Sequence, residues 1–121
     1  MATAYITHRA CQLHDMGDGH PECPERVAAV DAALSAGGLM ASLKQAEAPK
    51  AERVHTERVH ESDYLDMLDE ASPRSGMVYL DPDTAMNPHS LEAAQRASGA
   101  AVLATDMVAN GEVDKIGRAH A

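Results

Sequence analysis

The chain has 121 residues and carries 10 Lys and Arg against 19 Asp and Glu, so its formal net charge is −9. This length allows one small domain at most. No apolar run approaches the roughly 18 residues that span a bilayer, and residues 1–13 lack the apolar region of a secretory signal, so we expect a soluble, cytoplasmic protein that does not bind membranes. The acidic charge argues against direct binding of nucleic acid, because that affinity comes mainly from Lys and Arg.

Large apolar side chains are scarce in this sequence. Leu, Ile and Val together number 19, Phe and Trp are absent, and Ala alone accounts for 23 residues. Leu, Ile, Val and Phe therefore make up less than roughly 20% of the chain, the level below which an independent core becomes doubtful at high net charge. We expect the chain either to pack loosely or to be part of something larger.

The first third of the chain predicts a strand, an irregular loop and a helix. Residues 4–7 are β-prone, and residues 8–24 form a polar loop rich in Gly and Pro. The helix should begin at Pro24, because proline suits the first helical position, and should end at Gly37-Gly38. Its buried stripe should consist of the apolar residues at helical spacing, Val27, Val30 and Leu34.

The middle of the chain predicts a weak strand and then helical segments. Residues 43–48 are candidates for the strand, which Pro49 would end. Residues 51–71 should be helical in two pieces, with Ser62 as the N-cap of the second. The buried stripe of that second helix should be Tyr64, Leu65 and Leu68.

The last third predicts a turn with two carboxylates and a long helix. A short extended run over residues 77–80 leads into an Asp-Pro-Asp-Thr turn at residues 81–84. The Asn87-Pro88 pair indicates a helix start, and the helix should run from about residue 88 to residue 109. Its many alanines, together with Gly99, allow a neighbouring segment to approach closely but bury little area.

Cysteine and histidine residues of the first loop have the spacing of metal ligands. Two residues separate Cys11 from His14, and two separate His20 from Cys23. These ligand types suit tetrahedral Zn²⁺. In the alternative interpretation, which we favour, the cysteines are small buried residues and the histidines hydrogen-bond to loop carbonyls.

Two further features carry charged groups suited to binding. Two prolines stiffen a loop that delivers Arg26 to the first turns of a helix, where a guanidinium is able to hold a carboxylate through two bonds. The carboxylates of residues 81–84 offer acceptors for the backbone amides of a substrate. The ordinary alternatives are a surface ion pair of Arg26 with Glu22 or Glu25 and a simple capped turn, and the residues alone favour these alternatives.

A resemblance to a known enzyme family begins in the same loop. Residues 7–27, with the core His-Pro-Glu-Cys-Pro-Glu-Arg at residues 20–26, resemble the opening of class II histone-deacetylase-like amidohydrolases. That family includes bacterial acetoin-utilisation and acetylpolyamine deacetylases. Residues 59–65 are similar to its V-H-S-x-x-Y segment, and residues 80–84 to its D-x-D-T loop. The resemblance covers about residues 4–114.

The resemblance implies an α/β fold of the arginase–deacetylase type, in which helices flank a parallel central sheet in three layers. Members hydrolyse an N-acetyl amide with Zn²⁺, which polarises the acetyl carbonyl and activates water, while paired histidines manage protons and a tyrosine donates to the oxyanion. The motifs that carry these groups do not occur in this sequence. The resemblance therefore implies zinc in the intact enzyme, with its ligands outside this chain, and no catalysis by the chain alone.

Two residues of this sequence match positions with a role in the family. Arg26 matches the arginine at the inner end of the channel, in the acetate exit region. Asp83 matches the aspartate at the pocket rim, which accepts hydrogen bonds from substrate amides. The substrate of the intact enzyme would be acetyl-lysine, an acetylpolyamine or a similar acetylated amine. The sequence makes no prediction of an oligomeric state.

The resemblance also predicts how the chain is divided. Residues 1–114 should form an incomplete N-terminal part of a histone-deacetylase-like domain, and residues 115–121 a non-native tail, because residues 116–120 look like translated sequencing-adapter sequence. One alternative is a truncated regulator that docks on a full-length paralogue. Another is a small structural-zinc or interaction module built on Cys11, His14, His20 and Cys23.

Overall fold

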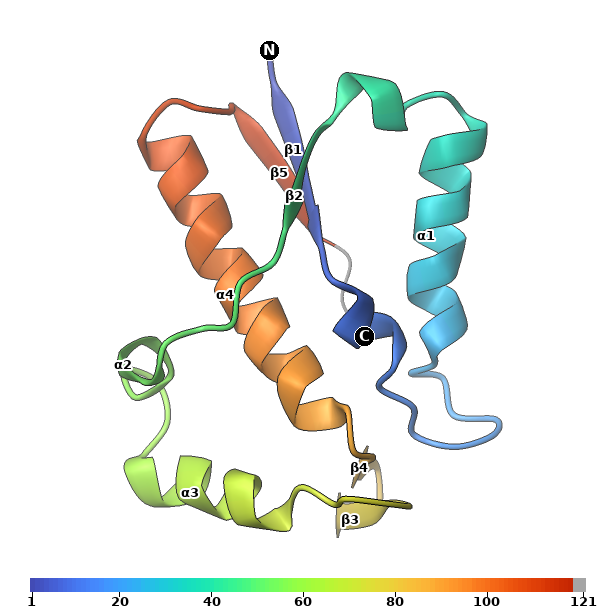
Figure 1. Cartoon of the computed structure of the whole chain (residues 1–121), viewed down its shortest axis with the longest axis vertical. Helices are drawn as coiled ribbons and strands as arrows, with labels where there is room; N and C mark the ends of the chain where they lie inside the picture. The colour runs from blue at the N-terminus through green and yellow to red at the C-terminus, as the bar shows by residue number, and fades with distance from the viewer. Residues whose placement is uncertain (119–121) are drawn as a thin grey trace.

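The computed structural model describes residues 1–118 and has a three-stranded parallel sheet at its centre. The strands are β1 (Thr3–Thr7), β2 (Lys44–Glu47) and β5 (Lys115–Arg118), with β1 in the middle (Figure 1). Ala4 of β1 pairs with Lys44 of β2 and with Ile116 of β5. Parallel neighbours need crossover connections, and these carry the helices. The predicted α/β class with a parallel central sheet is confirmed.

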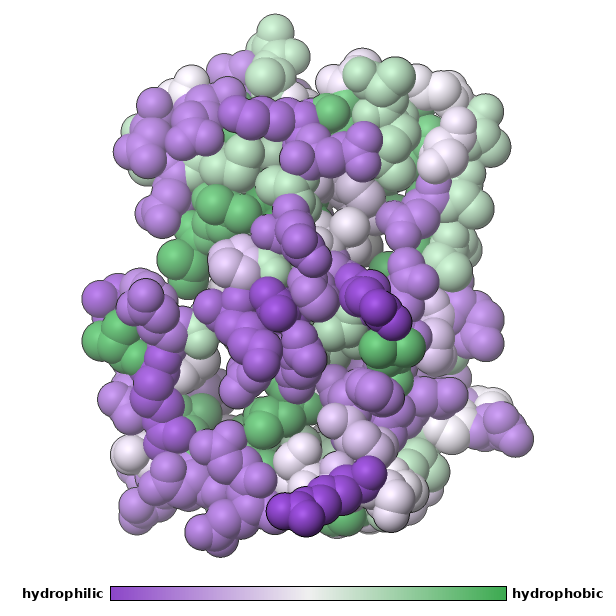
Figure 2. Space-filling view, viewed as in Figure 1, coloured by the Kyte–Doolittle hydropathy of each residue, from purple (hydrophilic) through white to green (hydrophobic). Residues whose placement is uncertain are grey.

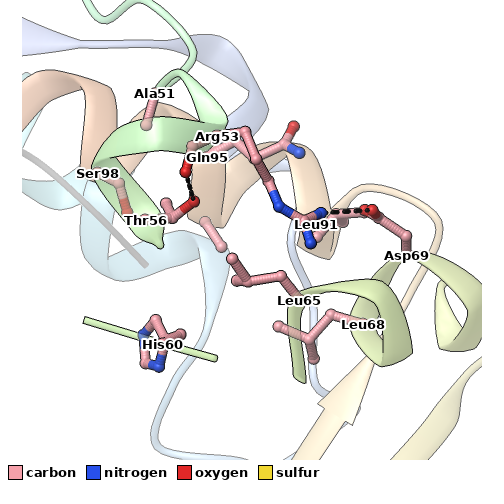
Figure 3. Close-up of a pocket in the computed structure, with 11 residues that line it drawn as sticks. Ala51, Arg53, Thr56, His60, Leu65, Leu68, Asp69, Leu91, Gln95 and Ser98 are labelled. Atoms are coloured by element: carbon pink, nitrogen blue, oxygen red, sulfur yellow. Dashed lines mark hydrogen bonds and ion pairs between the residues drawn. The ribbon is translucent and has the colours of Figure 1, made fainter. Parts of the chain in front are cut away.

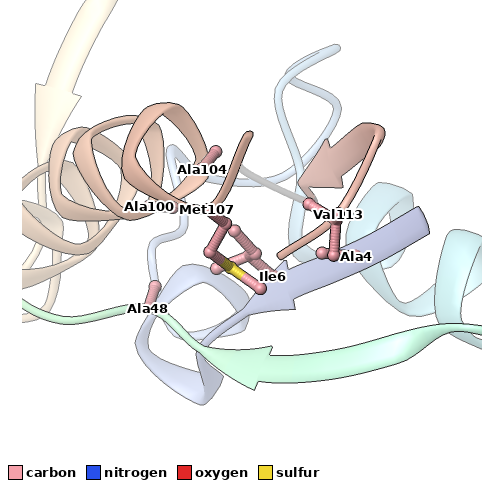
Figure 4. Packing of buried hydrophobic residues seen from close by; sticks show 7 residues of the cluster. All are labelled: Ala4, Ile6, Ala48, Ala100, Ala104, Met107 and Val113. Carbon is pink, nitrogen blue, oxygen red and sulfur yellow. The ribbon is translucent and has the colours of Figure 1, made fainter. Parts of the chain in front are cut away.

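Side chains of β1 alternate between two helical layers. Ala4 and Ile6 are fully buried on the side of α4 (Ser90–Ala109), whereas Tyr5 packs on the side of α1 (Pro24–Ala36). The core on the α4 side consists mainly of small residues (Figure 4): Ala4, Ile6, Ala48, Ala100, Ala104, Met107 and Val113. The alanines of α4 therefore provide the close approach to the sheet that the composition predicts.

Helix α1 has the predicted ends, with Pro24 at its first position and Gly37 just beyond its last. Val27 is buried against Tyr5 and Leu34 is half-buried, but Val30 is 45% exposed, so the predicted stripe is wrong at Val30. The narrow sheet is the physical reason. On this side β1 offers only Tyr5 to the cluster, and a stripe of three residues is wider than the surface that covers it.

Two helices that follow β2 in the sequence lie away from the sheet (Figure 1). A 3₁₀ turn, η2 (Met40–Ser42), precedes β2. The two helices that come after this strand are α2 (Arg53–Thr56) and α3 (Ser62–Ala71). The N-cap of α3 is Glu61, not the predicted Ser62, whose Oγ instead accepts a hydrogen bond from Arg53 at 3.2 Å. The predicted stripe of α3 is not fully buried, because α3 does not pack on the sheet: Tyr64 is exposed, and Leu65 and Leu68 are half-buried.

The carboxylate-rich turn joins two strands, of which the sequence predicts only the first. β3 (Val78–Asp81) and β4 (Thr84–Met86) form an antiparallel hairpin. The three residues of β4 are too few to show a strand pattern. Helix α4 begins at Ser90, slightly later than predicted, because Asn87 Oδ1 accepts the backbone N–H of His89 at 3.0 Å and closes a turn before the helix.

The segment after β2 crosses α4 in backbone contact. A Cβ atom added at Gly99 would lie 1.8 Å from the carbonyl oxygen of Pro49. The backbone N–H of Ala51 donates to the backbone carbonyl oxygen of Gln95 in α4 at 3.0 Å. Only glycine permits such an approach, so the close contact predicted for this helix depends on Gly99.

The predicted non-native tail begins with residues that form a strand. Lys115–Arg118 make up β5, and Arg118 donates from Nη1 to the carbonyl oxygen of Ala97 at 3.0 Å. The rest of that tail, residues 119–121, lies outside the described residues. A foreign origin of the tail stays a prediction, because pairing with β1 does not bear on where a sequence comes from.

Candidate functional site

An open groove of about 610 Å³ lies between the loop that precedes α1 and the tip of the β3–β4 hairpin. We call residues 15–23 the entrance loop and this cavity the loop–hairpin groove. Its walls come from these two segments: Met16, Asp18, Gly19, His20 and Pro21 on one side, and Tyr79, Pro82 and Asp83 on the other. Two of these described lining residues are carboxylates and none is Lys or Arg, so the groove suits a cationic ligand or one that offers N–H donors.

Local hydrogen bonds shape the entrance loop. It follows a 3₁₀ turn, η1 (Arg9–Gln12). The backbone N–H of Gly17 donates to Asp15 Oδ1 at 2.9 Å, and Gly17 has φ of +99°, a conformation that favours glycine. Further along, the backbone N–H of Glu22 donates to His20 Nδ1 at 2.9 Å. These bonds, with the prolines of the loop, order the wall that faces the hairpin.

The two aspartates of the hairpin turn have different surroundings. Asp81 Oδ1 accepts the backbone N–H of Asp83 at 2.8 Å, so its carboxylate shapes the turn. Asp83 is exposed and lines the loop–hairpin groove, whereas Asp81 does not. Of the two carboxylates, that of Asp83 is therefore the one available to a ligand in the groove.

Arg26 lies apart from this groove. Its guanidinium pairs with Glu22, which lies four residues earlier in the loop before α1, and its side chain is 56% exposed. This is the surface ion pair that the residues alone favour. Arg26 is not among the lining residues, so the structure does not bring Arg26 and Asp83 into one cavity. A role for Arg26 in a channel stays a prediction.

Both cysteines are free thiols, and they lie in different environments. Cys11 is buried, its Sγ is 3.9 Å from the carbonyl oxygen of Ala93 in α4, and burial raises the pKa of its thiol. Cys23 is half-buried and occupies the N-cap position of α1. Cys11 thus behaves as the small buried residue of the interpretation without a metal.

The two histidines of the predicted zinc module also have separate partners. His14 Nδ1 lies 2.6 Å from Ser90 Oγ, whereas His20 Nδ1 accepts a bond within its own loop. Their partners are a hydroxyl and a backbone N–H, not the loop carbonyls expected. Within residues 1–118, no three His, Cys, Asp or Glu side chains are grouped so that they could hold a metal ion. The structure therefore does not bring Cys11, His14, His20 and Cys23 together.

A second cavity, of about 240 Å³, lies where α2, α3 and α4 meet (Figure 3). Leu65 and Leu68 of α3 line it. Arg53 spans its edge, with Nη2 2.8 Å from Asp66 Oδ1 and Nη1 3.4 Å from Asp69 Oδ2. Sequence reasoning misses Arg53, because an arginine among acidic residues forms no distinctive pattern.

Comparison with known proteins identifies the family. The family described as the histone deacetylase domain matches residues 20–120. A histone deacetylase-like amidohydrolase of Pseudomonas aeruginosa is 35% identical over 96 residues, which cover 79% of this chain and 25% of that protein. Histone deacetylase 5 of Arabidopsis thaliana is 31% identical over 115 residues, which cover 84% of this chain and 16% of that protein. The crystal structure of the HDA15 HD domain matches 98% of this chain and 35% of its own, with a TM-score of 0.89 and 25% identity.

This chain belongs to the histone deacetylase family, and the predicted fold, a part of the deacetylase α/β domain, is confirmed. The chain spans a quarter or less of the length of these curated relatives and about a third of the solved domain. Among residues 1–118, no helix combines the length and the apolar character needed to cross a membrane.

Proposed function

We propose that this chain is the N-terminal part of a deacetylase that hydrolyses N-acetyl amides, and that it supplies the entrance to the active site. The loop–hairpin groove carries the proposal, because it presents the exposed carboxylate of Asp83 in a chain of the histone deacetylase family. The proposed substrates are acetyl-lysine in a peptide, an acetylpolyamine or a similar acetylated amine.

Asp83 is the proposed contact for the part of the substrate that stays outside the active site. A peptide offers backbone N–H groups and a polyamine offers ammonium groups, and a carboxylate accepts hydrogen bonds from both. Asp18 on the opposite wall adds a second negative charge to the groove. The groove thus favours an amine-based substrate over an anionic one.

Arg26 is the proposed contact for the acetate product at the inner end of the channel. A guanidinium binds a carboxylate through two parallel hydrogen bonds. The partner of Arg26 in this chain is Glu22, and both side chains are about half exposed. Exposed ion pairs contribute little free energy, so Glu22 would yield to a competing carboxylate at low cost.

The zinc ion expected for the family does not fit the residues of this chain. Within residues 1–118 no group of three ligands forms, and Cys11 Sγ and His14 Nδ1 are directed to α4. We therefore derive no catalytic step from this chain. The metal-binding and catalytic residues are proposed to lie elsewhere in the enzyme, and the isolated chain is expected to be inactive.

A chimera tests this proposal, in which residues 1–114 replace the matching segment of the Pseudomonas aeruginosa relative. We expect the chimera, supplied with zinc, to deacetylate an acetyl-lysine peptide. Asp83→Asn should raise KM about fivefold to tenfold: the amide oxygen still accepts a hydrogen bond, but a neutral bond contributes about 0.5–1.5 kcal/mol where a bond to a charged group contributes about 1.5–3 kcal/mol. Asp81→Asn is the matched control and should change KM much less, since its remaining amide oxygen still accepts the turn hydrogen bond.

Three outcomes would contradict the proposal. A folded, zinc-loaded chimera without turnover would contradict the deacetylase function. An active chimera with the same KM after Asp83→Asn would show that the groove is not the substrate entrance. Turnover by the isolated chain with added Zn²⁺, lost on Arg26→Ala, would place the catalytic centre within this chain.

A further inference from the structure

The entrance loop and the hairpin are joined by a hydrogen-bonded network at the start of α4. His14 Nδ1 lies 2.6 Å from Ser90 Oγ, although the two residues are 76 positions apart in sequence. Ser90 Oγ accepts the backbone N–H of Asn87 at 2.8 Å and lies 3.0 Å from Asn87 Oδ1. Asn87 Nδ2 donates to the carbonyl oxygen of Leu13 at 2.8 Å. Residues 13–14 are thereby tied to residues 87–90.

The two ends of this network adjoin the two walls of the groove. His14 immediately precedes the entrance loop, and Asn87 immediately follows β4, whose hairpin carries Asp83. The hairpin forms a separate sheet, so no ladder of the central sheet fixes its position. In the part of the chain that the structure describes, the hydrogen bonds between residues 13–23 and residues 78–90 all belong to this network.

The bonds around Ser90 are partly shielded from water, whereas the bond from Asn87 to Leu13 lies at the surface. Ser90 is 7% exposed, and His14 and Ser90 both line a largely apolar cavity of about 250 Å³. The cavity is also lined by hairpin residues, including Leu80 and Met86. Hydrogen bonds in such surroundings are stronger and costlier to break than those in water. The partly buried bonds around Ser90 should therefore contribute more to joining the two walls than the surface bond to Leu13.

The hydroxyl of Ser90 has enough bonding capacity for all its partners. It donates to Asn87 Oδ1 and accepts the backbone N–H of Asn87. Its second lone pair is then left for His14 Nδ1, so this arrangement requires the tautomer of His14 that is protonated at Nδ1. An asparagine at position 14 would present a side-chain N–H in place of Nδ1–H, whereas a leucine would present none. These two substitutions separate the hydrogen bond from the volume of the side chain.

We propose that His14, Ser90 and Asn87 form a clamp that sets the spacing of the two walls of the loop–hairpin groove and so positions Asp83. The three are positioning residues, because they act on the groove through the entrance loop and the hairpin. Their role in substrate binding rests on the proposed function, whereas the clamp itself is a property of this chain.

Amide hydrogen exchange of the full chain tests the clamp. His14→Leu should speed exchange about tenfold in both residues 15–23 and residues 78–86, with β1 and α1 unchanged. His14→Asn should restore the wild-type rates. His89→Leu is the matched control, since it makes the same change at an exposed histidine beside the start of α4.

Serine substitutions give an independent second test. Ser90→Ala should reproduce the effect of His14→Leu on both walls, and Ser98→Ala, at an exposed position of the same helix, should not. Faster exchange in one wall only, or in β1 and α1 as well, would overturn the proposal. Failure of His14→Asn to restore the rates would also overturn it.

The chimera adds a kinetic measurement, KM against kcat, that a purely structural role of His14 would not change selectively. There, His14→Leu should raise KM severalfold with kcat retained, and His14→Asn should restore KM. Equal losses of kcat and kcat/KM would overturn the positioning role. If every chimera lacked turnover, the proposed function would fail, while the exchange result would still decide the clamp.

Discussion

His14 has an environment that controls its protonation. Burial lowers its pKa from the ordinary value of 6.5, and the nearby carboxylates of Glu22 and Asp15 oppose this shift less strongly. The folded chain therefore favours the neutral imidazole, and below about pH 6.5 the unfolded chain binds more protons. The stability that this residue contributes is complete above that pH and is lost as the pH falls through the pKa of the folded state.

This environment predicts a specific pH dependence. Between about pH 7.5 and about pH 5, the wild-type chain should lose more free energy of unfolding than His14→Asn, because asparagine does not titrate. Urea denaturation of both chains at the two pH values measures the difference, with His89→Asn as the control at an exposed histidine. The same pH dependence in the wild type and His14→Asn would refute the assignment to His14.

Gly99 is the residue at which a single added methyl group should matter most. Gly99→Ala places a Cβ 1.8 Å from the carbonyl oxygen of Pro49, and this clash with backbone outweighs the better helix propensity of alanine. We expect the free energy of unfolding to fall by about 2 kcal/mol, as for other overpacked sites. Thermal and urea unfolding check this. Ser98→Ala, one residue earlier and exposed, should be neutral or slightly stabilising; equal stability of the two variants would contradict the account.

At the scale of elements, the sequence predicts the helices and strands whose ends are set by neighbouring residues in the chain. Helix α1 follows from Pro24 and Gly37, and β1 from its short β-prone run. The stripe of α3 and the exposure of Val30 do not follow, because burial depends on which surface lies opposite. The pairing of β4 with β3 likewise depends on a partner strand, which three residues do not reveal.

Arg53 joins α2 to α3 and should control the stability of α3. It donates to the carbonyl oxygen of Ser62 at 2.9 Å and pairs with Glu57, Asp66 and Asp69. Arg53→Lys should speed amide exchange in α3 severalfold, because an ammonium group lacks the planar fork that reaches several acceptors at once. High salt should produce part of the same effect in the wild type.

Arg58→Lys serves as the control for this prediction, because it makes the same change at an exposed arginine between α2 and α3. It should leave exchange in α3 unaltered. Unchanged exchange in Arg53→Lys would show that the apolar contacts of Leu65 and Leu68, and not the ion pairs, hold α3 in place.

At the scale of the whole molecule, the low content of large apolar residues is reflected in its surface. Hydrophilic side chains cover most of the face seen in Figure 2, with hydrophobic patches between them. Large apolar side chains remain exposed at Val59, Leu39 and Tyr79, with 80%, 56% and 63% of their surface accessible. The core itself is made largely of alanine around Ile6 and Met107. The fold is therefore ordered but has a small core, as expected for one part of a larger domain.

The separate positions of the cysteines and histidines predict how the whole chain responds to zinc. We expect the purified chain to contain much less than one equivalent of zinc and its melting temperature to be unchanged by a chelator. Elemental analysis and thermal unfolding with and without EDTA measure both. Stoichiometric zinc with unfolding on chelation would favour the structural-zinc module on Cys11, His14, His20 and Cys23.

The sequence by itself determined the α/β class, the ends of α1 and the family, because these depend on residues that are close together in the chain. The motif at residues 20–26 and the turn at 81–84 belong to this local information. The resemblance already selected Asp83, but only the tertiary structure decided that this residue lines a groove together with the entrance loop, and that His14 bonds to Ser90. Such contacts depend on how the sheet, the hairpin and α4 pack, and no local spacing specifies the distance between segments so far apart in sequence.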